Sequence, residues 1–193
     1  MVLSTGNNKI RTAVFISGTG SNLNSLIKFS KTIKSPISIE FVISNNSKAK
    51  GLTYAKKYNI KKKVLNFKNQ SLAEKNLLSI LKSKNIEMIC LAGFMKILSK
   101  NFVKKFKGKI LNIHPSLLPK YKGLNTYKRA LNNKEKHSGC TVHFVNARLD
   151  SGKIIIQKKV KISKKETEAS LAKKILAQEH KLYPKAILKV FNL

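Results

Sequence analysis

Acidic residues, cysteines and long apolar runs are all scarce in this sequence of 193 residues. No stretch approaches the ~18 apolar residues of a membrane-spanning helix, and Met1–Arg11 lacks the apolar segment of a signal peptide. Cys90 and Cys140 lie in apolar, strand-like segments without metal-ligand spacing, so we expect buried thiols and no disulfide. These absences exclude a membrane protein and a disulfide-rich secreted protein, and they predict a cytoplasmic one.

The shortage of acids leaves a formal net charge of +32, from 40 Lys and Arg against 8 Asp and Glu. Clustered cations would indicate nucleic-acid binding. The lysines are spread over the whole chain, however, and only Arg11, Arg129 and Arg148 are arginines, the residue favoured for reading base edges. We therefore expect a solvated basic surface that attracts anionic small substrates, with a nucleic-acid-binding module as the distant alternative.

Strand patterns and amphipathic helix patterns alternate along the chain, which predicts a single α/β domain over residues 1–193. We expect an open, mostly parallel twisted sheet with helices on both faces. The expected strands span residues 12–17, 37–44, 63–67, 87–92, 110–114, 140–145 and 154–162, the last nearer an edge. The expected helices span residues 22–33, 48–58, 72–84, 98–106, 126–131 and 166–190, with a kink at Pro184.

A glycine-rich turn follows the first expected strand and reads Ser-Gly-Thr-Gly-Ser-Asn-Leu over residues 17–23. Such a turn lets the backbone approach a ligand, and the helix N-terminus after it favours a phosphate. The third glycine of the dinucleotide fingerprint is replaced by Leu23, and no acidic residue stands at the end of the second strand. The turn therefore favours a single phosphate monoester, or else it is only a tight turn.

An apolar segment with a sharp turn at Gly93 follows the fourth expected strand. Phe94, Met95, Ile97 and Leu98 offer a surface on which a flat heterocycle could pack. The same side chains could equally be core residues beneath a loop.

Asn112 and His114 form the most informative feature, because residues two apart on a strand point to the same face. Pro115 ends this strand, so an amide and an imidazole meet where open α/β sheets bind ligands. Asp150 could favour the protonated form of His114, although an Asp-Ser-Gly sequence is also a common turn. For His143, in an apolar strand, a structural role is the more natural interpretation.

The sequence contains no nucleophile elbow and no His, Cys or carboxylate cluster with metal-ligand spacing, so we expect no metal. General acid catalysis and oxyanion stabilisation remain, which suit direct transfer between two bound substrates.

Together these motifs resemble the folate-dependent phosphoribosylglycinamide formyltransferases. The resemblance rests on residues 16–23, 91–98, 111–121, 141–145, 150–152 and 178–180, and it covers nearly the whole chain after the first ten residues. It implies a Rossmann-like formyltransferase fold. It also implies transfer of the formyl group of 10-formyltetrahydrofolate, as co-substrate, to the amine of glycinamide ribonucleotide in purine (IMP) biosynthesis, by a monomer or homodimer.

The resemblance also implies residue roles. Asn112, His114 and Asp150 would be catalytic, with Asp150 raising the pKa of His114. The ribonucleotide would meet Gly20, Ser21, Asn22 and Glu179. The folate would meet Met95, Lys96, Ile97, Leu98, Asn112, Asn146, Ala147, Arg148, Leu149 and Asp150.

Some positions depart from the family pattern. Asn125 and Tyr127 stand where histidines often occur, Ser151 replaces a glycine, and an arginine expected at the folate tail falls near Gln70. Methionyl-tRNA formyltransferase and formyltetrahydrofolate hydrolase share the catalytic motif and remain the alternative functions.

Overall fold

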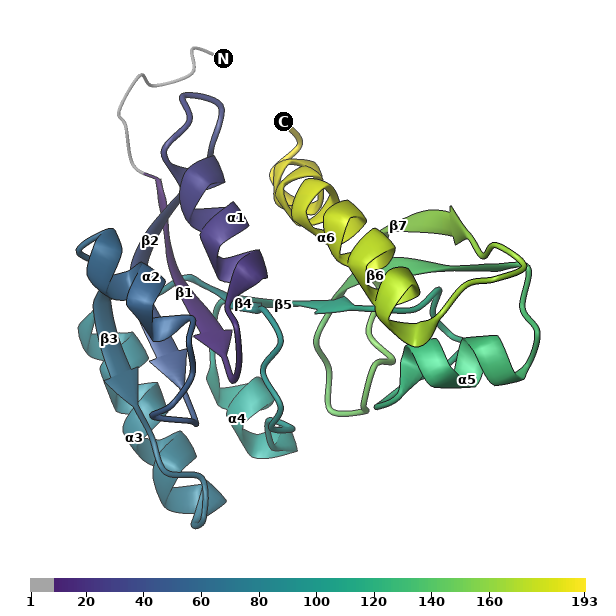
Figure 1. Ribbon diagram of the computed structural model, residues 1–193. Helices are drawn as coiled ribbons and strands as arrows, with labels where there is room; N and C mark the ends of the chain where they lie inside the picture. Colours follow the sequence, from purple (N-terminus) through teal and green to yellow (C-terminus); the bar gives the residue numbers. More distant parts are fainter. Residues whose placement is uncertain (1–8) are drawn as a thin grey trace.

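The computed structural model describes residues 9–193, which form one seven-stranded sheet in the order β3-β2-β1-β4-β5-β6-β7 (Figure 1). The strands are β1 Ile10–Ile16, β2 Ile37–Ser44, β3 Lys61–Val64, β4 Met88–Leu91, β5 Lys109–His114, β6 His137–Phe144 and β7 Ile154–Lys161. Strands β1 to β5 pair in parallel, whereas β5–β6 and β6–β7 are antiparallel. The predicted open, mostly parallel sheet is confirmed, and β7 is an edge strand as expected.

Six helices connect or close the described part of the sheet. They are α1 Ser21–Ser30, α2 Leu52–Lys57, α3 Gln70–Ser83, α4 Lys100–Lys105, α5 Thr126–Asn132 and α6 Glu168–Val190. Side-chain caps fix several of their starts: Asn69 accepts from the Leu72 N–H, and Ser99 accepts from the Phe102 N–H. The long helix α6 opens with a reciprocal capping box between Thr167 and Ser170, and it contains Pro184.

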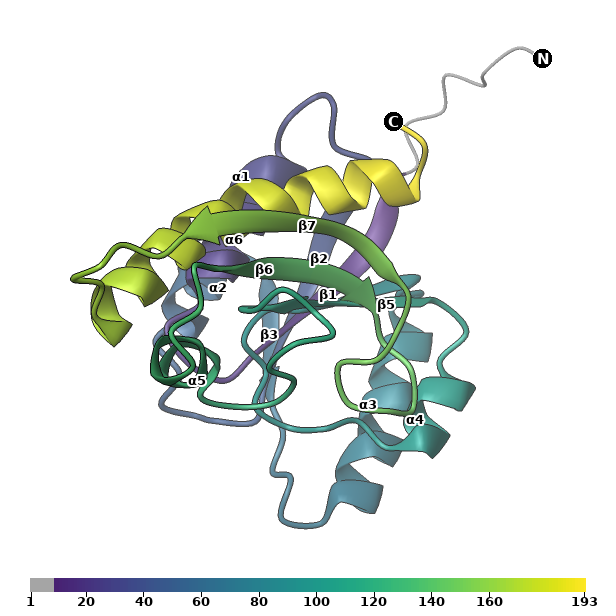
Figure 2. The same ribbon diagram turned by 90° about the vertical axis from the view of Figure 1, so that its right-hand side faces the viewer.

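The core has two halves, one on each face of the sheet. Alternate residues of β1 enter different halves, Val14 on one face and Phe15 on the other. Helices α1 and α6 pack with the Val14 half, and α6 lies along β6 and β7 (Figure 2). Helices α3 and α4 pack with the Phe15 half. Helices therefore cover both faces, as the sequence predicts.

The third strand is the clearest error of the sequence prediction. It was expected at 63–67, but β3 spans Lys61–Val64, and all four of its residues are exposed. Leu65 and Phe67 are buried, yet they lie after the strand, where they enter the core beside α3. The alternation of buried and exposed residues over this segment resembles the pattern of a strand, because a loop that runs along the core can also bury every second residue.

The chain order across the sheet sets the position of the site. From β1 the chain proceeds to β2 and β3 on one side, and then returns to β4 and β5 on the other. The carboxyl ends of β1 and β4 therefore flank a topological switch point, where connections diverge and leave a crevice for a ligand.

Candidate active site

Two turns meet at this switch point and are tied together by Ser17. The Ser17 N–H donates to the Gly93 carbonyl (3.1 Å), and the Ser17 hydroxyl accepts from the Met95 N–H (2.7 Å). The glycine-rich turn after β1 and the apolar turn after β4 are thus held as one rim. The two motifs are therefore neighbours in the structure, although they lie far apart in the sequence.

The glycine-rich turn begins α1 at Gly20, whose φ of +74° lies in the left-handed region. A Cβ at Gly20 would lie 2.5 Å from the Cα of Gly51, and the Gly51 N–H donates to the Gly18 carbonyl. The turn therefore needs glycine for both conformation and space. No side chain caps the N-terminus of α1, so its first N–H groups are available for an anion.

Asn22 and Glu179 meet beside this helix start, although 157 residues separate them. The Asn22 Nδ2 donates to a Glu179 carboxylate oxygen at 2.7 Å, and both side chains are buried, with 8% and 5% exposed. Burial raises the pKa of Glu179 to about 7, against the smaller effect of the Asn22 hydrogen bond. The Asn22 Oδ1 is buried without a partner, which leaves an acceptor for a bound ligand.

The strand β5 carries Asn112 and His114 to the rim, and β6 pairs with it in antiparallel register. His143 lies directly opposite Asn112, and Thr141 lies opposite His114. Paired residues share a face of the sheet, so the register places His143 beside the two predicted catalytic residues.

His114 is held through both ring nitrogens. Its Nε2 lies 2.9 Å from the Tyr121 carbonyl, and its Nδ1 lies 3.4 Å from the Asp150 Oδ2. Burial lowers the pKa of His114 below its ordinary value, and this outweighs the Tyr121 carbonyl and Asp150, which both raise it. Asp150 therefore acts on the pKa of His114 in the expected direction, although burial has the larger effect.

Asp150 lies at the centre of the cluster, with its φ of +45° in the left-handed region. Its Oδ2 accepts from the Gly123 N–H at 2.9 Å, and its Oδ1 lies 3.4 Å from the Asn112 Nδ2. Burial alone would raise the pKa of Asp150, but the contacts with His143, Gly123 and His114 together hold it below its ordinary value. Asp150 is therefore an anion placed to stabilise a positive charge on His114.

His143 fixes the orientation of the Asn112 amide, a role that sequence reasoning missed. The His143 Nδ1 lies 2.8 Å from the Phe144 carbonyl, which can only accept, so this nitrogen carries the proton. The other nitrogen, Nε2, lies 3.2 Å from the Asn112 Nδ2 and 3.6 Å from the Asp150 Oδ1. One amide hydrogen of Asn112 is fixed by the contact with His143, and the other meets Asp150 only at the longer 3.4 Å distance.

The apolar turn after β4 combines exposed and buried side chains. Met95 and Ile97 are each 63% exposed and Lys96 is exposed, whereas Leu98 is buried in the core. Gln70 donates to the Ile97 carbonyl at 2.8 Å, so it supports this turn from α3. The exposed residues suit a flat ligand, and Leu98 supports them from below.

The loop before Asp150 closes the other side of the rim. Asn146, Ala147, Arg148 and Leu149 are all exposed. The Arg148 N–H donates to the Asn146 side-chain oxygen, which shapes the loop locally. Only Asp150 turns inward, so the loop could present its exposed residues to a ligand while Asp150 joins the cluster.

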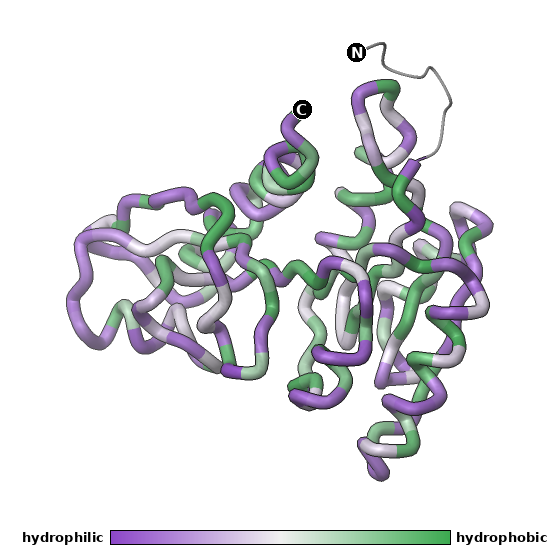
Figure 3. Tube along the Cα trace, turned by 180° about the vertical axis from the view of Figure 1, so that it is seen from behind, coloured by the Kyte–Doolittle hydropathy of each residue, from purple (hydrophilic) through white to green (hydrophobic). Residues whose placement is uncertain are grey.

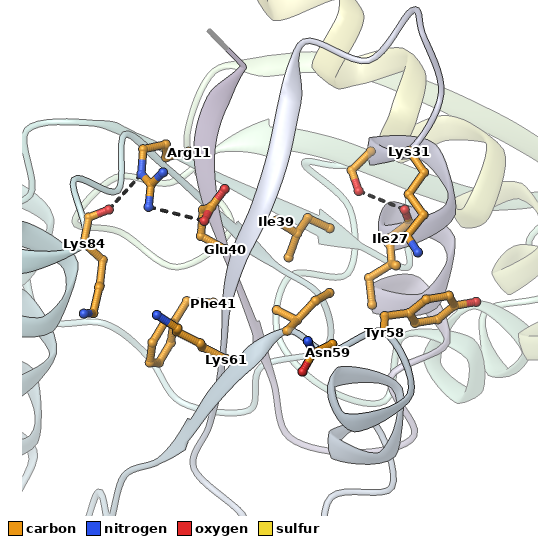
Figure 4. Close-up of a pocket in the computed structure, with 12 residues that line it drawn as sticks. Arg11, Ile27, Lys31, Ile39, Glu40, Phe41, Tyr58, Asn59, Lys61 and Lys84 are labelled. Atoms are coloured by element: carbon orange, nitrogen blue, oxygen red, sulfur yellow. Dashed lines mark hydrogen bonds and ion pairs between the residues drawn. The ribbon is translucent and has the colours of Figure 1, made fainter. Parts of the chain in front are cut away.

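A separate cavity of about 300 Å³ lies at the opposite edge of the sheet (Figure 4). It is lined by residues of β1, β2 and β3 and of the segments beside them, among them Arg11, Glu40, Tyr58 and Lys61. None of the predicted site residues lines it.

Residues 9–193 contain no group of three or more His, Cys, Asp or Glu that could hold a metal ion. They also contain no helix with the length and apolar character of a membrane span.

Comparison with known proteins assigns this arrangement to a family. The model of the family described as "Formyl transferase" matches residues 10–187. The chain is 43% identical over 178 residues to the phosphoribosylglycinamide formyltransferase of Haemophilus influenzae, covering 91% of this chain and 84% of that protein. The chain belongs to the phosphoribosylglycinamide formyltransferase family.

Other members of this family agree in sequence and fold. The crystal structure of the Anaplasma phagocytophilum phosphoribosylglycinamide formyltransferase superposes with a TM-score of 0.88 at 44% identity, covering 93% of this chain and 85% of that one. The human trifunctional purine biosynthetic protein adenosine-3 is 43% identical over 182 residues. That match covers 93% of this chain but only 18% of the length of the human protein.

Proposed function

We propose that this chain transfers the formyl group of 10-formyltetrahydrofolate to the amine of glycinamide ribonucleotide in de novo purine (IMP) biosynthesis. The proposal takes residues 1–193 as one formyltransferase domain, acting in the cytoplasm as a monomer or homodimer. The observation that carries it is the Asn112, His114 and Asp150 cluster at the carboxyl end of β5, beside an uncapped helix start suited to a phosphate.

The ribonucleotide is proposed to bind at the start of α1. The N–H groups around Gly20, Ser21 and Asn22 would hold its phosphate, because α1 has no side-chain cap and carries a partial positive charge at this end. Glu179 would meet the same substrate, and the unpartnered Asn22 Oδ1 would accept one of its hydrogen bonds.

The folate is proposed to bind between the two exposed segments of the rim. Met95, Lys96 and Ile97 would line one side, supported by Leu98 from below. Asn112 and the loop residues Asn146, Ala147, Arg148, Leu149 and Asp150 would line the other side. The apolar area of Met95 and Ile97 suits a pteridine ring, and backbone groups could hydrogen-bond to its edge.

In the proposed reaction, the substrate amine forms a bond to the formyl carbon, and the bond from that carbon to the folate nitrogen then breaks. The Asn112 Nδ2 would give up its long 3.4 Å contact with Asp150 and donate to the oxyanion instead. This hydrogen bond would stabilise the new negative charge. His114, with a lowered pKa, would accept the proton that the amine loses and donate it to the departing folate nitrogen. Asp150 would stabilise the transient imidazolium.

The test is an assay in which 10-formyltetrahydrofolate and glycinamide ribonucleotide are supplied and release of tetrahydrofolate is followed. We expect turnover that His114→Ala or Asp150→Asn lowers by about a hundredfold or more, while substrate binding survives. Glu40→Gln, a charge change in the ion pair with Arg11 at the far edge of the sheet, is the control.

Two results would contradict this function. In the first, the folded protein shows no turnover with glycinamide ribonucleotide but formylates charged initiator tRNA. This result would favour the methionyl-tRNA formyltransferase reaction. The second is near-wild-type turnover in either catalytic variant, which would remove the roles given to His114 and Asp150.

A further inference from the structure

A single turn of backbone contacts both members of the His114–Asp150 pair. The Tyr121 carbonyl accepts from the His114 Nε2 at 2.9 Å, and the Gly123 N–H donates to the Asp150 Oδ2 at 2.9 Å. The orientation of the imidazole and of the carboxylate therefore depends on one three-residue segment, residues 121–123. A small rotation of this segment would misalign both groups together.

This turn has an unfavourable backbone conformation. Tyr121 has a φ of +56° and Gly123 a φ of +76°. Glycine adopts this region freely, whereas a residue with a Cβ does so only at an energetic cost. A strained tyrosine persists only where its surroundings hold it in place.

The side chain of Tyr121 supplies that support. Its hydroxyl donates to the Glu135 Oε1 at 2.8 Å and accepts from the Asn133 Nδ2 at 3.0 Å. Lys120 binds the same Glu135 oxygen at 2.7 Å, and the Arg129 guanidinium lies 5.2 Å from the centre of the tyrosine ring. Glu135 is linked to His114 through the side chain and backbone carbonyl of Tyr121, whereas Arg129 holds the same turn directly by donating to the Lys122 carbonyl at 2.7 Å.

We propose that Tyr121 and Glu135 are positioning residues for the reaction. Their hydrogen bond anchors residues 121–123, whose carbonyl and N–H aim His114 and Asp150. The kinetic part of this inference rests on the proposed function, but the effect on His114 is measurable without substrate. The charged and titratable groups that face His114 are Asp150, His143 and Arg129, and none of them is altered in the variants below.

The test compares Tyr121→Phe and Glu135→Ala with wild type. Tyr121→Phe keeps the ring and removes only the hydroxyl, and Glu135→Ala removes the acceptor. We expect each to lower kcat by about tenfold or more, because misplaced catalytic groups lose alignment, with KM changed by no more than about twofold. Glu135→Gln keeps an acceptor oxygen for the hydroxyl and should restore most of kcat. Tyr58→Phe, on the opposite side of the sheet, is the matched control for hydroxyl removal.

The second measurement is the NMR titration of the His114 ring in the ligand-free protein. The Tyr121 carbonyl favours the protonated imidazole, so loosening it should move the midpoint of His114 to lower pH in Tyr121→Phe and Glu135→Ala. A wild-type midpoint and wild-type kcat in both variants overturn the proposal. So does a loss confined to KM with an unchanged midpoint, because the anchor would then shape substrate binding. If wild type shows no turnover at all, the proposed function fails, while the midpoint still decides the positioning role.

Discussion

Glu179 shows how the ionisation of a single buried residue can oppose stability. Its carboxyl group is 5% exposed, and its one hydrogen bond to Asn22 does not offset the loss of water. Its pKa of about 7 in the folded protein compares with an ordinary value of 4.5. A buried carboxyl group with one hydrogen bond suits the proposed contact of Glu179 with the ribonucleotide.

We therefore predict that Glu179→Gln stabilises the protein at alkaline pH. Because the folded pKa is raised, the contribution of Glu179 to stability is fully present below about pH 4.5 and is lost as the pH rises through about 7. The loss is on the order of 3 kcal/mol at full ionisation, and the neutral amide avoids it. Urea unfolding at about pH 5 and about pH 8 measures the free energy of unfolding of each protein.

Glu168→Gln, at an exposed position on the same helix, is the control and should leave the pH dependence unchanged. Equal pH slopes for wild type and Glu179→Gln would show that the carboxyl group ionises freely in the folded protein. If Glu179→Gln raised KM for the ribonucleotide without changing stability, the proposed binding role would be supported. The predicted effect of Glu179 on stability would then be wrong.

At the scale of elements, the turn between β1 and α1 depends on a contact between two glycines. Gly20 starts α1, and Gly51 precedes α2, yet their backbones touch because Gly51 donates to the Gly18 carbonyl. The sequence motif indicates the first glycine, but no pattern around Gly51 indicates that it completes the turn. Because Gly20 and Gly51 have no side chains, the starts of α1 and α2 can approach each other closely at the proposed phosphate site.

Gly20→Ala should therefore disrupt this turn. The new Cβ would lie 2.5 Å from the Gly51 Cα, and the φ of +74° is unfavourable for alanine. We expect a loss of roughly 1–3 kcal/mol in the free energy of unfolding and a weaker site for phosphate. Gly18→Ala is the matched control for unfolding, because a Cβ there meets nothing within 4 Å. Equal stability of the two variants in thermal unfolding would contradict this account.

The strand β3 shows another constraint at this scale. It is one of the two edge strands of the sheet, and it contains Lys61, Lys62 and Lys63. Charged side chains on an edge strand oppose pairing with another molecule. Val64 is the only apolar residue of this strand, which explains why the predicted strand lies too far toward Leu65 and Phe67.

At the scale of the whole molecule, charge is the dominant property. The net charge of +32 comes from cations spread along the whole chain, and hydrophilic residues occur along outer segments on both sides of the fold (Figure 3). Both proposed substrates are anions, one through a phosphate and the other through its carboxylates. A positive field of this size raises their local concentration and their rate of encounter.

We predict that kcat/KM falls by about tenfold or more as ionic strength rises from about 0.01 M to about 1 M, because the screening length shrinks from ~30 Å to ~3 Å. The constant kcat should change little, since the groups of the catalytic cluster are in contact and are poorly screened. Steady-state kinetics across a salt series measures both. If kcat/KM did not change with ionic strength, the positive charge would not serve to attract the substrates. Tight, salt-sensitive RNA binding would favour the nucleic-acid alternative.

The fold class, the strand that carries Asn112 and His114, and the glycine-rich turn are all predictable from the sequence, because these features depend on local periodicity and on residues adjacent in the chain. The structure alone decided the contacts between distant segments. It placed His143 against Asn112, joined Asn22 to Glu179, and brought Tyr121 and Gly123 into contact with His114 and Asp150. The opposing effects of burial and of Asp150 on the pKa of His114 could also be compared only in the structure. A pKa and a hydrogen-bond partner depend on what surrounds a group in space, and sequence spacing does not contain that information.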